Sequence, residues 1–155
     1  MHPRIGLGTD RHALVNGNGL VLGGIRIPCT LGVVAHSDGD VLLHALTDAL
    51  LGAVAAGDIG DLFPDTDPEN LDRHSAVFVE EAMRRVGEAG YRVGNLDATV
   101  HLQQPKLSSH KTAIRERIAS LCDISAASVS LKAKTGEGLG VVGEGKAMEA
   151  IVVVL

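Results

Sequence analysis

The clearest pattern along the chain is an apolar stripe that recurs every three or four residues between positions 41 and 53. This spacing predicts an amphipathic α-helix with one face in a core. Ser37 precedes the stripe as a candidate N-cap, and Asp40 follows three residues later in the position of a capping box. Asp40, His44 and Asp48 recur at four-residue steps, so we expect them to share the neighbouring face of this helix.

Shorter apolar runs predict strands on both sides of this helix. A Gly-Gly pair at residues 23–24 separates two such runs, 20–22 and 25–27, and predicts a hairpin. Two further helices are expected, one from Asp72 or Ser75 to near Gly90 and one at about residues 109–122. Further strands are expected at residues 4–9, 91–102, 129–133 and 150–155, and a polar loop with four aspartates at residues 57–67.

This order of elements bounds the fold class. Helices that separate strands favour a mixed sheet with helices on one face. The pattern therefore predicts an α/β or α+β fold, in a single domain that spans residues 1–155.

Composition narrows the class of protein. Among 155 residues, 45% are apolar but only three are aromatic, so the core must be built from aliphatic side chains. A formal net charge of −5 argues against a nucleic-acid surface, and no apolar run is long enough to span a membrane. Cys29 and Cys122 are isolated, and no secretory leader precedes the first strand, which together predict reduced thiols in a cytoplasmic protein. A disulfide between the two cysteines is the alternative.

Asp10, His12 and His44 form a candidate metal site. Asp10 and His12 are two residues apart on an expected extended segment, where alternation points both side chains to one face. An imidazole from the predicted helix would complete a set of three ligands. Two imidazoles and one carboxylate leave the fourth position of a tetrahedral zinc ion open, as catalytic sites require. The alternative interpretation of Asp10 and His12 is a solvated strand end without a metal. If the metal site forms, we expect Asp40 to hydrogen bond the second ring nitrogen of His44.

Several longer motifs occur in order along nearly the whole chain. They are RIGLGTDRH at residues 4–12, AHSDGD at 35–40, HALTDALLG at 44–52, GDIG at 57–60, FPDTD at 63–67, PK at 105–106 and KAKTGEGLG at 132–140. With these motifs the chain resembles the 2-C-methyl-D-erythritol 2,4-cyclodiphosphate synthase family.

The resemblance implies a fold, an assembly and a reaction. The family has a ferredoxin-like α/β sandwich and forms a homotrimer with active sites between neighbouring subunits. It converts 4-diphosphocytidyl-2-C-methyl-D-erythritol 2-phosphate into the 2,4-cyclodiphosphate and releases CMP, in non-mevalonate isoprenoid biosynthesis. The resemblance implies Zn²⁺ on Asp10, His12 and His44, and Mg²⁺ or Mn²⁺ between Glu137 and the substrate diphosphate.

The resemblance also implies the remaining site residues. His36 and Thr135 take catalytic roles, with His36 and Ser37 at the substrate phosphates. The substrate-binding positions are Ser37, Asp58, Ile59, Gly60, Phe63, Pro64, Asp65, Thr66, Asp67, Leu102, Gln103, Gln104, Pro105, Lys106, Leu107, Ser108, Lys134, Gly136 and Val141.

Several of these residues also have simpler interpretations. His36 fits a solvated loop residue, and Gly60 fits a tight backbone turn. Residues 63–67 fit an ordinary Pro-Asp turn, and Lys106 fits a surface lysine beside a proline.

The chain departs from the family pattern at residues 143–146. Many relatives read Gly-Arg-Gly-Glu where this chain reads Gly-Glu-Gly-Lys. An ungapped alignment replaces the arginine by Glu144 and the glutamate by Lys146, whereas a two-residue gap keeps Glu144 and deletes the arginine. In both alignments a phosphate-binding arginine is missing, and Lys146 offers only a point charge in its place. The missing arginine leaves a non-catalytic metal- or nucleotide-binding trimer as an alternative function. A zinc phosphohydrolase is a second alternative, because an open zinc position can also activate water.

Overall fold

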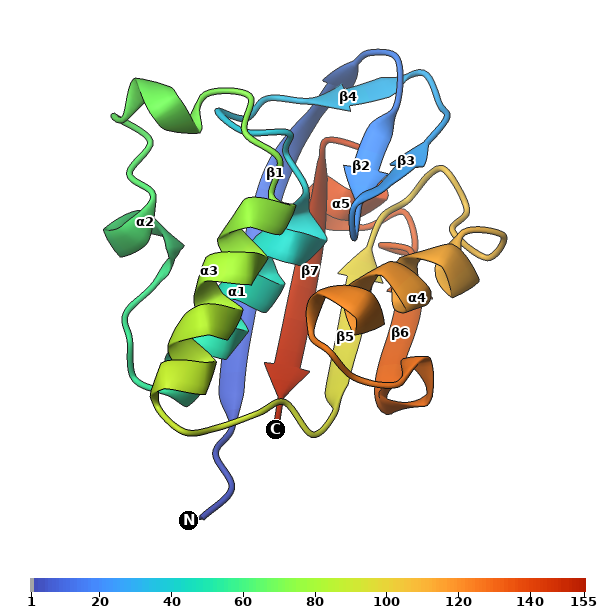
Figure 1. The fold of residues 1–155 in the computed structure, drawn as a ribbon. Coiled ribbons are helices and arrows are strands. Elements are labelled where there is room, and N and C mark those ends of the chain that lie inside the picture. The colour runs from blue at the N-terminus through green and yellow to red at the C-terminus, as the bar shows by residue number, and fades with distance from the viewer. Residues whose placement is uncertain (1) are drawn as a thin grey trace.

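The computed structural model describes residues 2–155 and contains a five-stranded mixed sheet beside a two-stranded hairpin (Figure 1). The sheet order is β4-β1-β7-β5-β6, and only the β5–β6 pair is parallel. The sheet strands are β1 (Gly6–Asn16), β4 (Leu31–Val33), β5 (Leu96–His101), β6 (Val129–Lys134) and β7 (Ala147–Val154), and the hairpin strands are β2 (Leu20–Leu22) and β3 (Ile25–Ile27).

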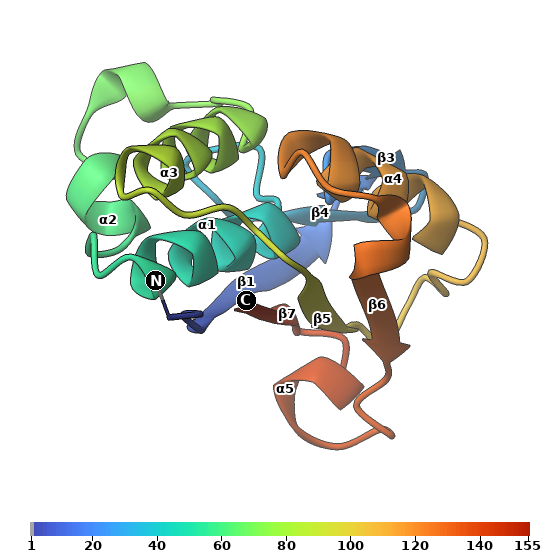
Figure 2. The ribbon, with the colours of Figure 1, turned by 60° about the horizontal axis from the view of Figure 1, so that its bottom comes forward.

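Three long helices cover one face of the sheet, as the alternation of strands and helices predicts (Figure 2). They are α1 (Val41–Ala53), α3 (Ala76–Glu88) and α4 (Lys111–Leu121). The shorter elements are α2 (Ile59–Leu62), α5 (Gly140–Gly143) and the 3-10 turns η1 (Pro68–Asn70) and η2 (Ala126–Ser128). Among the helices of residues 2–155, α5 alone lies on the other side of the sheet, so helices leave most of that face uncovered. Within residues 2–155, no helix combines the length and the apolar character needed to cross a membrane.

The connectivity differs from that of the expected ferredoxin-like sandwich. Its two layers are present, but the four long strands and the three long helices follow the order β-α-α-β-α-β-β. A ferredoxin-like domain follows β-α-β-β-α-β. The physical reason is that β5 and β6 are parallel neighbours, so the chain needs the crossover helix α4 between them.

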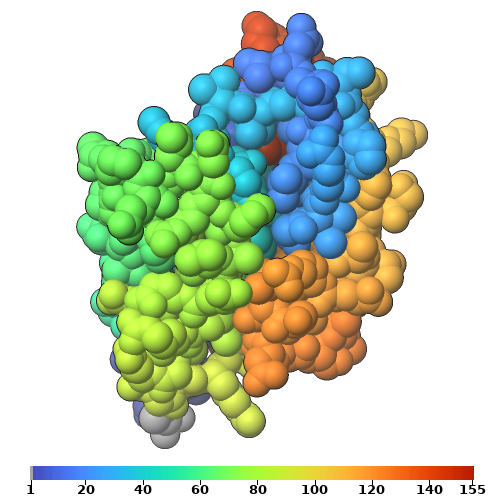
Figure 3. Space-filling view, turned by 45° about the horizontal axis from the view of Figure 1, so that its top comes forward, coloured from blue at the N-terminus to red at the C-terminus, as the bar shows by residue number. Residues whose placement is uncertain are grey.

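Two glycines on β1 allow α1 to pack unusually close to the sheet. A Cβ atom at Gly6 would lie 1.7 Å from the carbonyl oxygen of Ala49, and one at Gly8 would lie 1.8 Å from that of Ala45. Helix α1 therefore lies directly on the β1 backbone and buries its leucines, including Leu42, in the core. The β2–β3 hairpin completes the helical side of the core beside α3 and α4 (Figure 3).

The structure confirms the predicted helices and hairpin and corrects several boundaries. Strand β1 extends to Asn16 rather than Thr9, which places Asp10 and His12 inside the strand. The N-cap of α1 is Asp40 and not Ser37, since the Asp40 carboxylate accepts from Leu43 N. The expected polar loop contains α2, which Asp58 and Asp61 close with a capping box. The expected strand at residues 91–102 shortens to β5, whereas the expected strand at 150–155 begins earlier, in β7, and the sequence pattern did not predict β4.

Candidate active site

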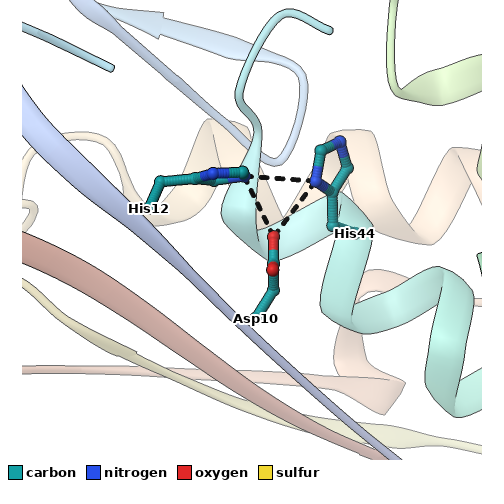
Figure 4. A group of neighbouring side chains, drawn as sticks. All are labelled: Asp10, His12 and His44. Atoms are coloured by element: carbon teal, nitrogen blue, oxygen red, sulfur yellow. Dashed lines mark hydrogen bonds and ion pairs between the residues drawn. The ribbon is translucent and has the colours of Figure 1, made fainter. Parts of the chain in front are cut away.

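The three predicted metal ligands converge at the contact between β1 and α1 (Figure 4). Asp10 and His12 project from the same face of β1, and His44 reaches them from the first turns of α1. Asp10 Oδ2 lies 3.0 Å from both His12 Nε2 and His44 Nδ1, and the two ring nitrogens are 3.2 Å apart. Because Gly6 and Gly8 bring the helix onto the strand, the fold itself sets this convergence.

The spacing of these three atoms fits a small divalent cation. A tetrahedral ion with bonds of about 2.0–2.1 Å holds its ligand atoms about 3.3 Å apart. The observed triangle, with sides of 3.0–3.2 Å, is close to one face of such a tetrahedron. One carboxylate and two imidazoles also form a donor set that divalent transition metals favour. Asp10, His12 and His44 can therefore hold a divalent metal ion.

The charge on Asp10 is favoured by its two neighbours. Burial acts to raise the pKa of the Asp10 carboxyl, but hydrogen bonds from His12 and His44 outweigh it and hold this pKa well below its ordinary value. The side chains of His12 and His44 are only 15% and 12% exposed, so the two imidazoles act on Asp10 with little screening by water. The carboxylate is thus ready to bind a cation.

The second nitrogen of His44 contacts serines rather than Asp40, which corrects the predicted contact. His44 Nε2 lies 2.8 Å from Ser75 Oγ and 3.0 Å from Ser37 Oγ. Asp40 instead faces the β2–β3 turn, where its carboxylate accepts from Gly23 N at 2.9 Å and Gly24 N at 2.7 Å.

Asp40 is a fully buried carboxyl group. Burial raises its pKa to about 6, although backbone hydrogen bonds from Leu43, Gly24 and Gly23 oppose the shift. Asp40 therefore ties α1 to the hairpin and does not act on the metal ligands directly.

A pocket of about 330 Å³ opens beside the three ligands. It brings together several of the residues expected at the substrate phosphates and hydroxyls, namely His36, Ser37, Ile59, Gly60, Phe63 and Asp65. Val34, Asn70 and Phe78 also line it, and the sequence did not single them out. Phe78 stacks against both Phe63 and His44, with ring centroids 4.5 and 5.8 Å apart. Its place in the predicted helix at residues 72–90 gave no signal of this role.

The residues expected at the nucleotide line a separate pocket of about 180 Å³. It is formed by the segment after β5 and the end of β6, and its predicted members are Leu102, Gln103, Pro105, Lys106, Leu107, Ser108, Lys134 and Thr135. Gln103 Oε1 accepts from Gly136 N at 3.0 Å and links the two segments. The metal-side pocket and this nucleotide-side pocket share no residue.

Glu137 and several other expected site residues line neither of these two pockets. Thr135 Oγ1 lies 3.3 Å from Glu137 Oε1, and both side chains are exposed. Gln104 belongs to a third pocket, formed with residues 29–31 and 143–145. Asp58, Pro64, Thr66, Asp67, Gly136, Glu137 and Val141 line neither the metal-side nor the nucleotide-side pocket.

At residues 143–146, where the sequence departs from the expected family pattern, Glu144 and Lys146 form an exposed ion pair. Lys146 Nζ lies 2.6 Å from Glu144 Oε2, with 70% and 52% of the two side chains exposed. Each group shifts the pKa of the other in favour of the charged forms. The lysine charge thus faces a carboxylate of its own segment.

Comparison with known proteins identifies the family. A model of the YgbB family matches residues 3–155. The 2-C-methyl-D-erythritol 2,4-cyclodiphosphate synthase of Koribacter versatilis (strain Ellin345) is 53% identical over 98% of this chain and 97% of its own length, and that of Moorella thermoacetica is 51% identical over 98% and 93%. A solved structure of such a synthase in its CDP-bound form superposes with a TM-score of 0.91, at 43% identity over 98% of this chain and 99% of that one. The chain therefore belongs to the YgbB family, as its motifs predict, and is an enzyme of the 2-C-methyl-D-erythritol 2,4-cyclodiphosphate synthase type.

Proposed function

We propose that the protein converts 4-diphosphocytidyl-2-C-methyl-D-erythritol 2-phosphate into 2-C-methyl-D-erythritol 2,4-cyclodiphosphate and CMP in the cytoplasm. The observation that carries this proposal is the Asp10–His12–His44 triangle, which lines a pocket together with His36 and Ser37. The names of the relatives and their identity over nearly the full chain support the same reaction.

The reaction joins two groups of one molecule. An oxygen of the 2-phosphate attacks the β-phosphorus, and the bond from that phosphorus to the bridging oxygen breaks, so CMP leaves with the α-phosphate. Both reacting groups are phosphates and the nucleophile is already anionic. The protein therefore has to position them and neutralise charge, and it needs no nucleophile of its own.

The residues of each pocket have proposed tasks. Asp10, His12 and His44 would hold Zn²⁺, which supplies a Lewis acid for a phosphoryl oxygen. Glu137 would hold Mg²⁺ or Mn²⁺ together with the substrate diphosphate, because a carboxylate and phosphate oxygens form a normal environment for magnesium.

Direct contacts would come from the remaining predicted residues. His36 and Ser37 would bind the phosphates beside the metal, and Asp58 would bind the methylerythritol hydroxyls. Residues 102–108 would bind the cytosine and ribose, and Lys134 and Thr135 the nucleotide phosphates. Gly136 and Val141 complete this second set.

The separation of the two pockets supports an active site shared between subunits of a homotrimer. One substrate must reach both the triad and residues 102–108, yet these line different pockets of a single chain. The bare face of the sheet supplies a surface for a second copy, because it exposes Leu7, Ile151 and Val153 in neighbouring strands. These side chains are 61%, 38% and 39% exposed, and burying such a patch would favour assembly.

Product analysis tests the proposed reaction. The purified protein is incubated with substrate and Mg²⁺, and ³¹P NMR follows the phosphorus species. We expect cyclic diphosphate and CMP in equal amounts, and no product from His12→Ala. Linear hydrolysis products would instead identify a zinc phosphohydrolase, and an unchanged substrate would identify a binding protein.

Subunit mixing tests the shared site. His12→Ala removes a residue of the metal-side pocket, and Glu137→Ala one near the nucleotide-side pocket. Each variant alone should be inactive. Co-refolded mixtures should regain part of the wild-type activity, because some interfaces then join the intact metal side of a Glu137→Ala chain to the intact nucleotide side of a His12→Ala chain. A mixture as inactive as its components, in trimers shown to contain both chains, would contradict a site between subunits.

A further inference from the structure

His44 is held between two segments that are distant in the sequence. Its Nδ1 faces Asp10 and His12, and its Nε2 faces Ser75 at the N-terminus of α3 and Ser37 in the loop before α1. Ser75 is fully buried, so its hydroxyl has no access to bulk water and depends on protein partners.

The hydroxyl of Ser75 has a direction that its neighbours determine. Ser75 Oγ bonds Asp38 Oδ1, and Ser75 N donates to Asp38 Oδ2 at 2.9 Å. Asp40 N also donates to Asp38 Oδ1, at 3.1 Å. Since both oxygens of Asp38 accept from backbone N–H groups, Asp38 acts as a carboxylate acceptor, and the Ser75 proton points towards it. The lone pairs of Ser75 Oγ are then left for His44.

This direction favours a proton on Nε2 of His44. A hydroxyl that offers only lone pairs to Nε2 requires an N–H there, at the observed 2.8 Å. A neutral imidazole has one N–H, so a proton on Nε2 leaves the lone pair of Nδ1 for a cation between Asp10 and His12. In the metal-free protein Nδ1 also lies 3.0 Å from Asp10 Oδ2, so the Asp10 carboxylate competes with Ser75 for this proton. We propose that Ser75 and Asp38 are positioning residues, which hold His44 in the tautomer and orientation that metal binding requires. The inference rests on the proposed metal site and adds two residues to it.

The same chain of hydrogen bonds leaves Ser37 free to act on a ligand. Ser37 Oγ lies 3.0 Å from His44 Nε2, but a protonated nitrogen has no lone pair to accept the Ser37 proton. Ser37 also accepts from Gly39 N at 3.3 Å, and it lines the metal-side pocket. Its O–H is thus available to donate into that pocket, as a phosphate oxygen would need.

Backbone contacts keep the two segments together independently of these side chains. Asp72 N donates to His36 O at 2.7 Å, and Asp38 N donates to Arg73 O at 3.2 Å. Removing the Ser75 hydroxyl should therefore leave the segments in place and change mainly the environment of His44. The Ser75→Ala variant therefore tests the contact with His44 separately from the backbone contacts.

The experiment compares Ser75→Ala with Thr47→Val. Thr47 is also fully buried, lies on α1 and donates to Leu43 O at 2.8 Å, but it makes no hydrogen bond to a metal ligand. Zinc affinity is measured by competition with a chromophoric chelator, and stability by urea unfolding of the zinc-free proteins. We expect Ser75→Ala to weaken zinc binding by about 10- to 100-fold. Thr47→Val should lose stability and keep wild-type zinc affinity. Equal zinc affinity in Ser75→Ala and wild type, or an equal loss in both variants, would overturn the proposal.

Nitrogen-15 NMR of the histidine rings reports the tautomer of His44, which would not change if Ser75 only stabilised the fold. In the zinc-free proteins at alkaline pH, we expect a larger share of the Nε2–H form of His44 in wild type than in Ser75→Ala, where the Asp10 carboxylate alone draws the proton to Nδ1. Asp38→Asn offers a donor to Ser75, so the hydroxyl should turn its proton to His44 and shift the ring towards the Nδ1–H form. An unchanged tautomer in both variants would refute the assigned direction. Wild-type protein that binds no zinc would refute the proposed metal site instead, so the two failures are distinguishable.

Discussion

The metal-side and nucleotide-side pockets are built in opposite ways. The ligands of the metal side project from a strand and a helix in contact, and 12–27% of their side chains is exposed. On the nucleotide side, Lys106, Lys134 and Glu137 lie on loops or at a strand end and are exposed. The metal side is therefore positioned by the core of one chain, whereas the nucleotide side is left open to solvent.

This difference indicates which property each pocket controls. A group on packed secondary structure keeps its geometry without a ligand, which suits a metal that must be held with small tolerance. A group on an exposed loop can adapt to a nucleotide or a neighbouring subunit, and its loss should leave the fold intact. Mutations on the metal side should change stability and metal content together, and mutations on the nucleotide side should change activity alone.

The largest effect is expected at Gly8. In Gly8→Ala, the new Cβ would lie 1.8 Å from the backbone oxygen of Ala45, so α1 must move away from β1. We expect a loss of about 3 kcal/mol in the free energy of unfolding. Because His44 moves with α1, zinc content should fall as well. Urea unfolding and metal analysis of the purified variant measure both effects.

Gly87 provides the matched control for this substitution. It lies in α3, and a Cβ added there meets nothing within 4 Å. Gly87→Ala should therefore raise stability by about 0.5–1 kcal/mol through helix propensity and leave zinc bound. If Gly8→Ala behaved like Gly87→Ala, close packing of α1 on β1 would not be what positions the metal ligands.

The same contrast explains how much the sequence could predict. The α1 stripe and the Asp10–His12 alternation are local patterns, so the helix and the strand ligands follow from spacing alone. The local pattern predicted the N-cap at Ser37 and not at Asp40, because the Asp40 carboxylate is also held by Gly23 and Gly24 of a hairpin far away in sequence. Likewise, Ser75 fits a helix start in the sequence, and only the fold brings it to His44.

The second effect in size is expected at Glu137 on the nucleotide side. If Glu137 holds the second metal, Glu137→Gln should lower the rate by about 100-fold, or about 2.7 kcal/mol in the activation free energy. It should also weaken the magnesium dependence, and it should leave zinc content and unfolding unchanged because the side chain is exposed. The reaction rates of Glu137→Gln and wild type are measured at increasing Mg²⁺ concentrations and compared. A wild-type magnesium response with a shifted pH profile would assign Glu137 a proton-transfer role instead.

A smaller effect, on pH dependence, is expected from Asp40. Burial raises the pKa of this carboxyl to about 6 in the folded protein, above its ordinary value of about 4 in an unfolded chain. Its proton therefore stabilises the fold, with the contribution complete below pH of about 4 and lost as the pH rises through about 6. Relative to Asp40→Asn, the wild type should gain about 1 kcal/mol between pH 7 and pH 5.

Chemical unfolding of both proteins in the presence of a chelator measures this difference without interference from metal binding. Subtracting the variant removes the contributions of all other titrating groups that the two proteins share. A difference that stayed constant, or that fell towards pH 5, would show that the hydrogen bonds from Gly23, Gly24 and Leu43 outweigh burial at Asp40.

The smallest effect is expected at Lys146. The ammonium group and Glu144 form an ion pair at the surface, and both groups are solvated. Exposed pairs contribute little to stability because solvent screens them and their side chains lose freedom. Lys146→Ala should therefore leave the thermal midpoint, the zinc content and the rate at their wild-type values. Lys146→Arg should behave in the same way, because Glu144 would still neutralise the new guanidinium. A rate gain in Lys146→Arg that disappeared in high salt would show instead that this segment reaches the substrate phosphates, and would extend the open nucleotide side to residues 143–146.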